Sequence, residues 1–254
     1  MSSHTTGGTV GTAPQRPHLE AGIADTPEDV LEALRLRYRV FGEEMHAILP
    51  DAHLGLDRDR FDARCAHLTV RDRDTGRVVG TYRMLDARGA ELTGGFYSET
   101  EFDLSRVRAQ GTRLLEVGRA CIDPAYRTGA TIATLLGALT SHVVSRGYEH
   151  VIGCASIPIG GDPGGAAALC RRLIDAHGVA PEWRVVPHRP FAVHPIAPRL
   201  DAPVPPLLKA YLRMGARVGG EPAWDPDFDT ADLFIVMPIA ELTTRYARRF
   251  LRAA

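Results

Sequence analysis

Three groups of charged residues in this sequence could act on a small polar substrate. An acidic cluster spans residues 57–62 (DRDRFD), Arg83 follows it, and residues 116–119 (EVGR) come later in the chain. Carboxylates can hold an ammonium group and accept its proton, and an arginine can grip a carboxylate through two hydrogen bonds. The combination suits acyl transfer to an amino acid. A solvated loop with surface salt bridges is the competing interpretation.

The order of these segments is more specific than any one of them. Residues 36–41 (LRYRVF) precede the acidic cluster, and residues 79–83 (VGTYR) and 116–119 follow it, an order that resembles the acyl-homoserine-lactone synthase branch of the GNAT-type acyltransferases. Three further blocks resemble the ornithine lipid N-acyltransferase family more closely: 94–104 (GGFYSETEFDL), 207–213 (LLKAYLR) and 228–232 (FDTAD). The resemblance runs from about Leu19 to Phe250, which is nearly the whole chain.

The resemblance implies an α/β protein with a GNAT-like acyltransferase fold, in which helices flank a central mixed sheet. It implies transfer of a 3-hydroxyacyl group from acyl carrier protein to the α-amine of L-ornithine, giving lyso-ornithine lipid. The expected partners are therefore acyl carrier protein and the amino acid. No metal is expected, and no cofactor besides the phosphopantetheine thioester, which is a co-substrate.

The resemblance also implies roles for individual residues. It implies that the catalytic residues are Asp57, Glu116 and Arg119. It implies that the substrate-binding residues are Arg37, Phe41, Asp59, Asp62 and Arg83. Asp57 stands where the lactone synthases usually carry glutamate, the proposed base, so the shorter side chain would act through a water. Backbone N–H groups of residues 117–119 are expected to polarise the thioester carbonyl.

A covalent route through Cys154 is less favoured, because no histidine partner stands beside it in the sequence and a cysteine in an apolar strand is usually packed.

The segment after residue 122 departs from the acyl-CoA-dependent GNAT enzymes. They usually open the next helix with a glycine-rich run whose amides bind a pyrophosphate, and residues 126–132 (YRTGATI) lack glycine in that register. A carrier-protein phosphopantetheine presents one phosphodiester only. We therefore predict that Arg127 and Gly129 bind this group. The alternative is that Arg127 only caps a surface turn.

Local patterns predict the elements that hold these residues. Thr26 and Pro27 form a helix start, and apolar residues recur at helical spacing as far as Met45. Residues 66–71 and 77–85 alternate as two strands of a hairpin.

Further along the chain, a strand at 114–122, a helical stripe over 132–143 and a strand at 151–157 predict a crossover unit in a mixed sheet. A helix at 163–177 follows. The last part of the chain is predicted to form a helix ending near Met214, a strand around 233–237 and an arginine-rich helix.

Length and composition suit one domain. The chain has 254 residues, of which 44% are hydrophobic. Residues 1–17 are predicted to be a disordered lead, and residues 18–254 are predicted to form the acyltransferase domain with a C-terminal extension from about 181.

The net charge of −1 argues against a nucleic-acid partner. No apolar run approaches the roughly 20 residues of a membrane span, and no signal peptide is evident, so we expect a cytoplasmic protein.

Three alternatives to ornithine acylation stay open. Another amino acid could be the acceptor. A lactone synthase is disfavoured, because those enzymes tend to carry a tryptophan between the first helix and the acidic cluster, and here the tryptophans are Trp183 and Trp224. A protein of another class, a non-catalytic lipid- or membrane-interaction protein, would use the arginine-rich C-terminal helix on anionic lipid. Peripheral membrane contact is compatible with the enzyme as well.

Overall fold

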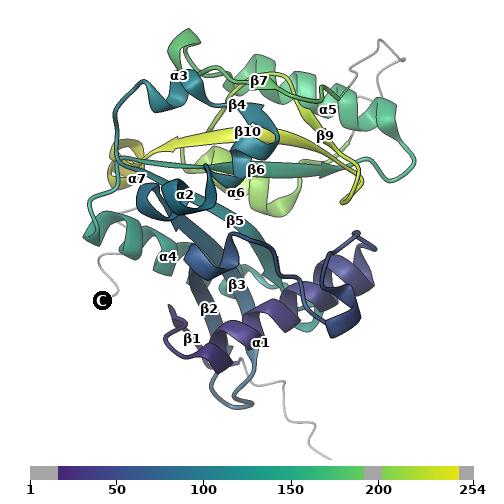
Figure 1. Ribbon diagram of the computed structural model, residues 1–254, viewed down its shortest axis with the longest axis vertical. Coiled ribbons are helices and arrows are strands. Elements are labelled where there is room, and N and C mark those ends of the chain that lie inside the picture. The colour runs from purple at the N-terminus through teal and green to yellow at the C-terminus, as the bar shows by residue number, and fades with distance from the viewer. Residues whose placement is uncertain (1–16, 192–201, 246–254) are drawn as a thin grey trace, which may run out of the picture.

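The computed structural model describes residues 17–191 and 202–245, which form a mixed sheet with helices on both faces (Figure 1). The eight strands of this sheet follow the order β1-β2-β3-β5-β6-β10-β8, with β9 paired to β10. Their bounds are β1 Leu19–Ile23, β2 Ala66–Asp72, β3 Val78–Asp86, β5 Leu114–Ile122, β6 His150–Pro158, β8 Arg217–Val218, β9 Ala223–Asp225 and β10 Thr230–Pro238. A separate small sheet joins β4 (Phe102–Asp103) to β7 (Val186–Pro187). The predicted α/β fold is confirmed, whereas nearly all of the predicted disordered lead lies outside the described residues.

The first helix begins where the sequence predicts. Helix α1 spans Pro27–Arg37, and the Thr26 hydroxyl caps it by accepting a hydrogen bond from the Asp29 amide at 3.1 Å. The chain then continues as a π-helix over Tyr38–Glu44, which the sequence pattern did not reveal. Such wider turns often occur at functional sites. This one buries Phe41, a residue predicted to bind substrate.

The crossover unit is also confirmed. Strand β5 leads through helix α4 (Gly129–Ser145) to the parallel strand β6. The two strands pair only from Leu114–Glu116 to His150–Ile152 and then separate, because β5 remains paired with β3 while β6 pairs with β10 along its whole length. The middle of the sheet therefore opens between β5 and β6.

Each face of the sheet has its own layer of helices. Helices α4, α5 (Pro163–His177), α6 (Pro206–Arg213) and α7 (Ile239–Arg245) contribute side chains to the largest apolar cluster on one face. The opposite face carries α1, the π-helix, α2 (Ala87–Thr93), a 3₁₀ turn (Tyr97–Thr100) and α3 (Ser105–Arg108). In Figure 1, α1 crosses the half of the sheet formed by β2 and β3, and α3 and β7 lie beyond β10.

Two further points concern the predicted C-terminal helix and the cysteines. Helix α7 is described as far as Arg245, so the remaining arginines of the predicted arginine-rich helix fall outside the described residues. Four free thiols are present, and those of Cys121 and Cys170 are buried, as expected for packed cysteines. Within the described ranges, no helix combines the length and apolar character that crossing a bilayer requires.

Candidate active site

The opening between β5 and β6 forms a cavity of about 250 Å³. Its polar wall includes Arg83, Tyr97, Glu116, Arg119 and Asp232. Its apolar wall includes Leu139, Val151, Leu208, Tyr211 and Met237. Gly153 lies where the strands diverge, and a Cβ added there would come within 2.2 Å of the Val117 carbonyl oxygen. Only glycine fits between the strands at this position.

A β-bulge directs Arg119 into the site. Thr81 pairs with Cys121 and Arg83 pairs with Gly118, so Arg119 and Ala120 together face the single residue between Thr81 and Arg83 on β3. Arg119 has φ +50°, which a residue with a side chain rarely adopts. An extra residue in one strand re-aims a side chain and ends regular pairing. The bulge thus points Arg119 to the acidic cluster, on the opened side of β5.

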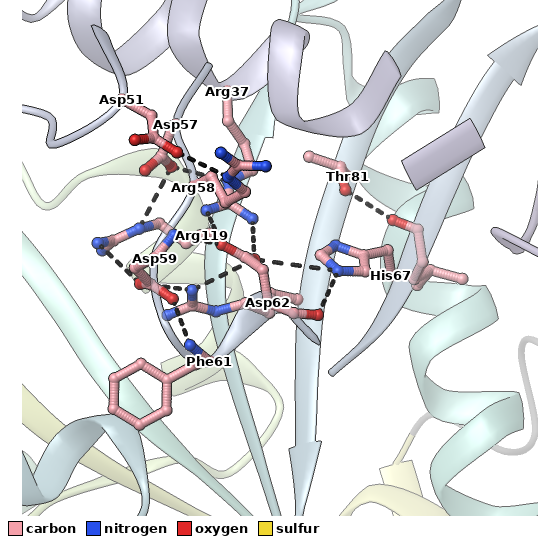
Figure 2. Close-up of polar contacts among 12 residues, drawn as sticks. Arg37, Asp51, Asp57, Arg58, Asp59, Phe61, Asp62, His67, Thr81 and Arg119 are labelled. Carbon is pink, nitrogen blue, oxygen red and sulfur yellow. Dashed lines mark hydrogen bonds and ion pairs between the residues drawn. The ribbon is translucent and has the colours of Figure 1, made fainter. Parts of the chain in front are cut away.

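Three arginines and three aspartates alternate around a closed ring of ion pairs, which we call the charge ring (Figure 2). Arg37 joins Asp57 (Nε to Oδ2, 2.7 Å) and Asp62 (Nη1 to Oδ1, 2.6 Å). Arg83 Nη1 joins Asp59 at 2.6 Å and Asp62 at 3.4 Å. Arg119 closes the ring, 3.3 Å from Asp57 and 3.6 Å from Asp59. The ring brings together six of the predicted site residues.

Four members of the ring are buried, Asp59 and Arg119 are partly exposed, and the charges stabilise one another. Burial alone would raise the pKa of Asp62, but the charges of Arg37 and Arg83 outweigh it and hold that pKa far below its usual range. Burial would likewise lower the pKa of Arg37, yet Asp57 and Asp62 raise it above its ordinary value. Arg37 and Asp62 therefore both stay ionised.

Glu116 holds the loop that covers the cavity. Its carboxylate accepts hydrogen bonds from the Tyr97 amide at 2.6 Å, the Ser98 amide at 2.7 Å and the Ser98 hydroxyl at 2.5 Å. Burial raises the pKa of Glu116, against the opposing effect of these hydrogen bonds. This carboxylate positions Tyr97, whose ring lies 5.0 Å from the guanidinium carbon of Arg119.

Phe41 lines the cavity from the π-helix. Its ring meets that of Phe228 edge-on, with centroids 5.7 Å apart. The guanidinium of Arg119 lies over the same Phe228 ring at 4.7 Å. Phe41 and Phe228 thus form an aromatic wall beside Arg119. This position is compatible with the predicted contact between Phe41 and substrate.

The two predicted donor-binding residues lie apart from these groups. Arg127 forms an ion pair with Glu44 and donates to the Ile122 carbonyl at 3.2 Å. Gly129 is the first residue of α4, where the Thr128 hydroxyl caps the helix by accepting from the Thr131 amide. Neither Arg127 nor Gly129 lines the cavity. Their role in donor binding stays a prediction.

Further polar groups at the cavity had no role assigned to them from the sequence, where Cys154 was considered as a nucleophile and disfavoured. Asp232 and Cys154 line it, and Glu101 lies beside both. Glu101 and Asp232 fall inside the blocks 94–104 and 228–232, so the resemblance contained the only signal for them. Burial raises the pKa of the Cys154 thiol well above its usual value, and that thiol donates to the Ser98 hydroxyl at 3.3 Å. A packed thiol, rather than a nucleophile, fits these contacts.

Comparison with solved structures agrees with this architecture. FeeM, an N-acyl amino acid synthase from uncultured soil microbes, superposes with a TM-score of 0.54 at 12% identity, covering 92% of this chain and 97% of FeeM. The acyl-homoserine-lactone synthase LasI gives a TM-score of 0.50 at 14% identity, covering 88% of this chain and 91% of LasI. At such identities the likeness concerns the fold alone.

Comparison with known sequences is more specific. Residues 36–137 match the family model described as an acetyltransferase (GNAT) domain. The chain is 36% identical over 248 residues to the L-ornithine N(alpha)-acyltransferase of Rhizobium meliloti, covering 90% of this chain and 83% of the relative. It is 34% identical over 250 residues to that of Rhodobacter capsulatus, covering 92% and 95%. With this identity over nearly its full length, and with the GNAT fold around the cavity, the chain belongs to the L-ornithine N(alpha)-acyltransferase family.

Proposed function

We propose that this protein transfers a 3-hydroxyacyl chain from the phosphopantetheine thioester of acyl carrier protein to the α-amine of L-ornithine, with lyso-ornithine lipid as the product. The observation that carries the proposal is the cavity between β5 and β6, which has arginines on its polar wall and aliphatic side chains on the other. A charged amino acid and an acyl chain could therefore meet within one opening of the sheet.

Arg83 and Arg119 are the groups suited to the acceptor carboxylate. Both guanidiniums line the cavity, and each keeps donors beyond those that its aspartate partners use. Asp57, Asp59 and Asp62 hold the guanidiniums in place, which limits the freedom lost when substrate binds. Under this proposal, the positioning residues are Arg37, Asp59 and Asp62, which act by holding the guanidiniums of Arg83 and Arg119 in place.

The reaction needs no covalent enzyme intermediate. The neutral α-amine attacks the thioester carbonyl carbon, the carbonyl oxygen takes up negative charge, and the C–S bond then breaks to release the phosphopantetheine thiol. Backbone N–H groups of residues 117–119 lie beyond the last β5–β6 pair, where they can face the oxyanion. Asp57 is our candidate base, since its Oδ1 is buried without a hydrogen-bond partner among the described residues. Because Asp57 is buried and does not line the cavity, the proton that the amine loses would pass to Asp57 through a water and then to the departing thiolate.

The donor would approach from the side of α4. Arg127 and the first amides of α4 are the candidate contacts for the single phosphodiester of phosphopantetheine, because helix N-termini favour anions. The apolar wall of the cavity suits the acyl chain. Since acyl carrier protein and ornithine are cytoplasmic metabolic partners and the product is a lipid, we place the reaction in the cytoplasm, with contact to the membrane surface.

The test is an assay of the purified protein with 3-hydroxyacyl carrier protein and a panel of amino acids. We expect N-acyl-ornithine as the main product by mass spectrometry, acylated at the α-amine. Acylation of S-adenosylmethionine with lactone release would instead identify a lactone synthase. Liposome binding with no acyl transfer to any acceptor would refute the enzymatic proposal.

A further inference from the structure

An acidic pair outside the charge ring borders the cavity. Glu101 follows the 3₁₀ turn Tyr97–Thr100, and Asp232 lies on β10. Their carboxylate oxygens and the Cys154 sulfur all lie within 4.8 Å of one another. Asp232 and Cys154 line the cavity, as does the half-buried Asp225. Three acids thus approach one part of the cavity wall.

This pair lacks the arginine partners that every aspartate of the charge ring has. Both carboxylate oxygens of Glu101 are buried, and neither has a hydrogen-bond partner of good geometry among the described residues. Asp232 is only 3% exposed and accepts a hydrogen bond from the Thr230 hydroxyl at 2.8 Å. Among the side chains that the structure describes, residues 17–191 and 202–242, no basic nitrogen comes within ion-pair distance of either carboxylate.

Such an arrangement costs folding free energy in the empty protein. Burial, followed by the charges of Asp232 and Asp225, raises the pKa of Glu101 well above its usual range. Burial also raises the pKa of Asp232 to about 6. Two buried like charges side by side disfavour ionisation, and an added cation would reverse that cost. The site is therefore built for a positive charge that the described part of the chain does not supply.

We infer that Glu101 and Asp232 bind the side-chain ammonium of the acceptor amino acid and so select a cationic acceptor. The inference rests on the proposed function. Arg83, Arg119 and Asp232 line the same cavity, and Glu101 lies beside Asp232, so a substrate carboxylate and a side-chain ammonium would each meet opposite charge. Tyr97 lies near both groups of residues. Its hydroxyl is 3.5 Å from Arg119 Nη1, and burial raises its pKa, an effect that the Arg119 charge opposes and the Glu101 charge reinforces.

An organic ammonium suits the pair better than a metal ion. An ammonium presents three N–H donors, which can reach Glu101, Asp232 and a further acceptor at once. A metal held by the same three residues would need the Cys154 thiolate and would break the contact in which this sulfur donates to the Ser98 hydroxyl at 3.3 Å. The metal is the alternative that the experiment must separate.

The experiment compares ornithine with norvaline, which has the same carbon chain without the ammonium. With wild-type protein we expect kcat/KM for ornithine to exceed that for norvaline by about tenfold to a hundredfold, the range for a hydrogen bond to a charged group. In Glu101→Gln and Asp232→Asn the preference should collapse through a higher ornithine KM, while slow norvaline acylation continues. Asp227→Asn is the matched control, because this acid lies on the same loop as Asp225 and is exposed.

The outcomes separate the two hypotheses. No acylation of any amino acid by wild-type protein would refute the proposed function itself. Acylation with equal efficiency for ornithine and norvaline, or variants that keep the ornithine preference, would overturn the inference alone. Loss of the preference on chelation, restored by zinc, would replace the ammonium site with a metal site. Ornithine should also raise the Tm of wild-type protein and not that of Asp232→Asn, a readout that does not depend on turnover.

Discussion

Arg119 Nε lies 3.3 Å from Asp57 Oδ2, the same oxygen that accepts the Arg37 hydrogen bond at 2.7 Å. The candidate base and a candidate carboxylate-binding arginine are therefore direct neighbours. A change in either one alters the environment of the other, so their roles can be separated only by variants that affect kcat and KM differently.

Asp57→Asn should lower kcat at neutral pH if Asp57 removes the proton of the α-amine. Activity should then recover partly as the pH rises, because solvent supplies neutral amine. Measuring kcat across a pH series checks this. Asp59→Asn is the control and should mainly raise the acceptor KM. A near-normal kcat for Asp57→Asn at neutral pH would place the base elsewhere, and a loss without recovery would mean that Asp57 only positions Arg119.

Arg37→Met should destabilise the protein by about 3–5 kcal/mol, the usual cost of removing one partner from a buried ion pair. Arg37 is 0% exposed and is the sole arginine bonded to both Asp57 and Asp62 in the described part of the chain. Denaturant unfolding measures the change in the free energy of unfolding.

The variant Arg119→Ala is to be compared with Arg37→Met, since the Arg119 side chain is partly exposed to the cavity. We expect this variant to unfold cooperatively with a much smaller loss of stability, and its acceptor KM to rise about tenfold to a hundredfold. Should Arg119→Ala lose cooperative unfolding together with activity, the residue belongs to the scaffold.

Gly153→Ala should destabilise the protein by about 1–3 kcal/mol, the typical cost of overpacking. The added Cβ would meet the Val117 carbonyl at 2.2 Å, and that oxygen belongs to the backbone and cannot rotate away. Gly118→Ala is the matched variant on the opposite strand, where a Cβ meets nothing within 4 Å. Thermal unfolding of the two should differ clearly, and equal Tm values would show that the strands separate further in solution.

The acidic pair predicts an unusual pH dependence of stability. The ordinary pKa of an aspartate is 3.8, and burial raises the pKa of Asp232 to about 6 in the folded protein. The native state then binds more protons than the unfolded state between these values, so the contribution of this group to stability falls as the pH rises through that window. Chemical unfolding of wild type from pH 4 to pH 7, compared with the variant Asp232→Asn, isolates the effect. A difference that stays constant over this range would contradict the raised pKa.

Arg127→Ala should raise the KM for acyl carrier protein several-fold and leave the ornithine KM unchanged. Carrier proteins are acidic, and screening lengths fall from about 10 Å at 0.1 M salt to about 3 Å at 1 M, so added salt should weaken wild-type binding more than variant binding. Glu44→Gln is an informative control, because it frees Arg127 from its ion pair and should tighten carrier binding. Acyl-CoA used as efficiently as acyl carrier protein would contradict the assignment of the donor.

Much of the fold could be predicted from local pattern. The strand Leu114–Ile122 and the helix Pro163–His177 have the bounds that the sequence predicted, and Thr26 caps the first helix as expected. These elements depend on signals within a few residues, namely alternation, helical spacing and capping chemistry. Strand β1 was missed: the alternation in its five residues Leu19–Ile23 is too short to predict a strand, and pairing with β2 holds them.

The types of the site residues were also present in the sequence, but their partners were not. Asp57 and Asp232 are the same residue type in the sequence, yet Asp57 forms ion pairs with two arginines and Asp232 lies beside another buried acid. That difference depends on the bulge that turns Arg119 and on the separation of β5 from β6, both of which arise from pairing between distant segments. The chain alone determined which charges are available, and only the tertiary structure decided which are neutralised and which remain for a substrate, because electrostatic energy depends on distance and burial.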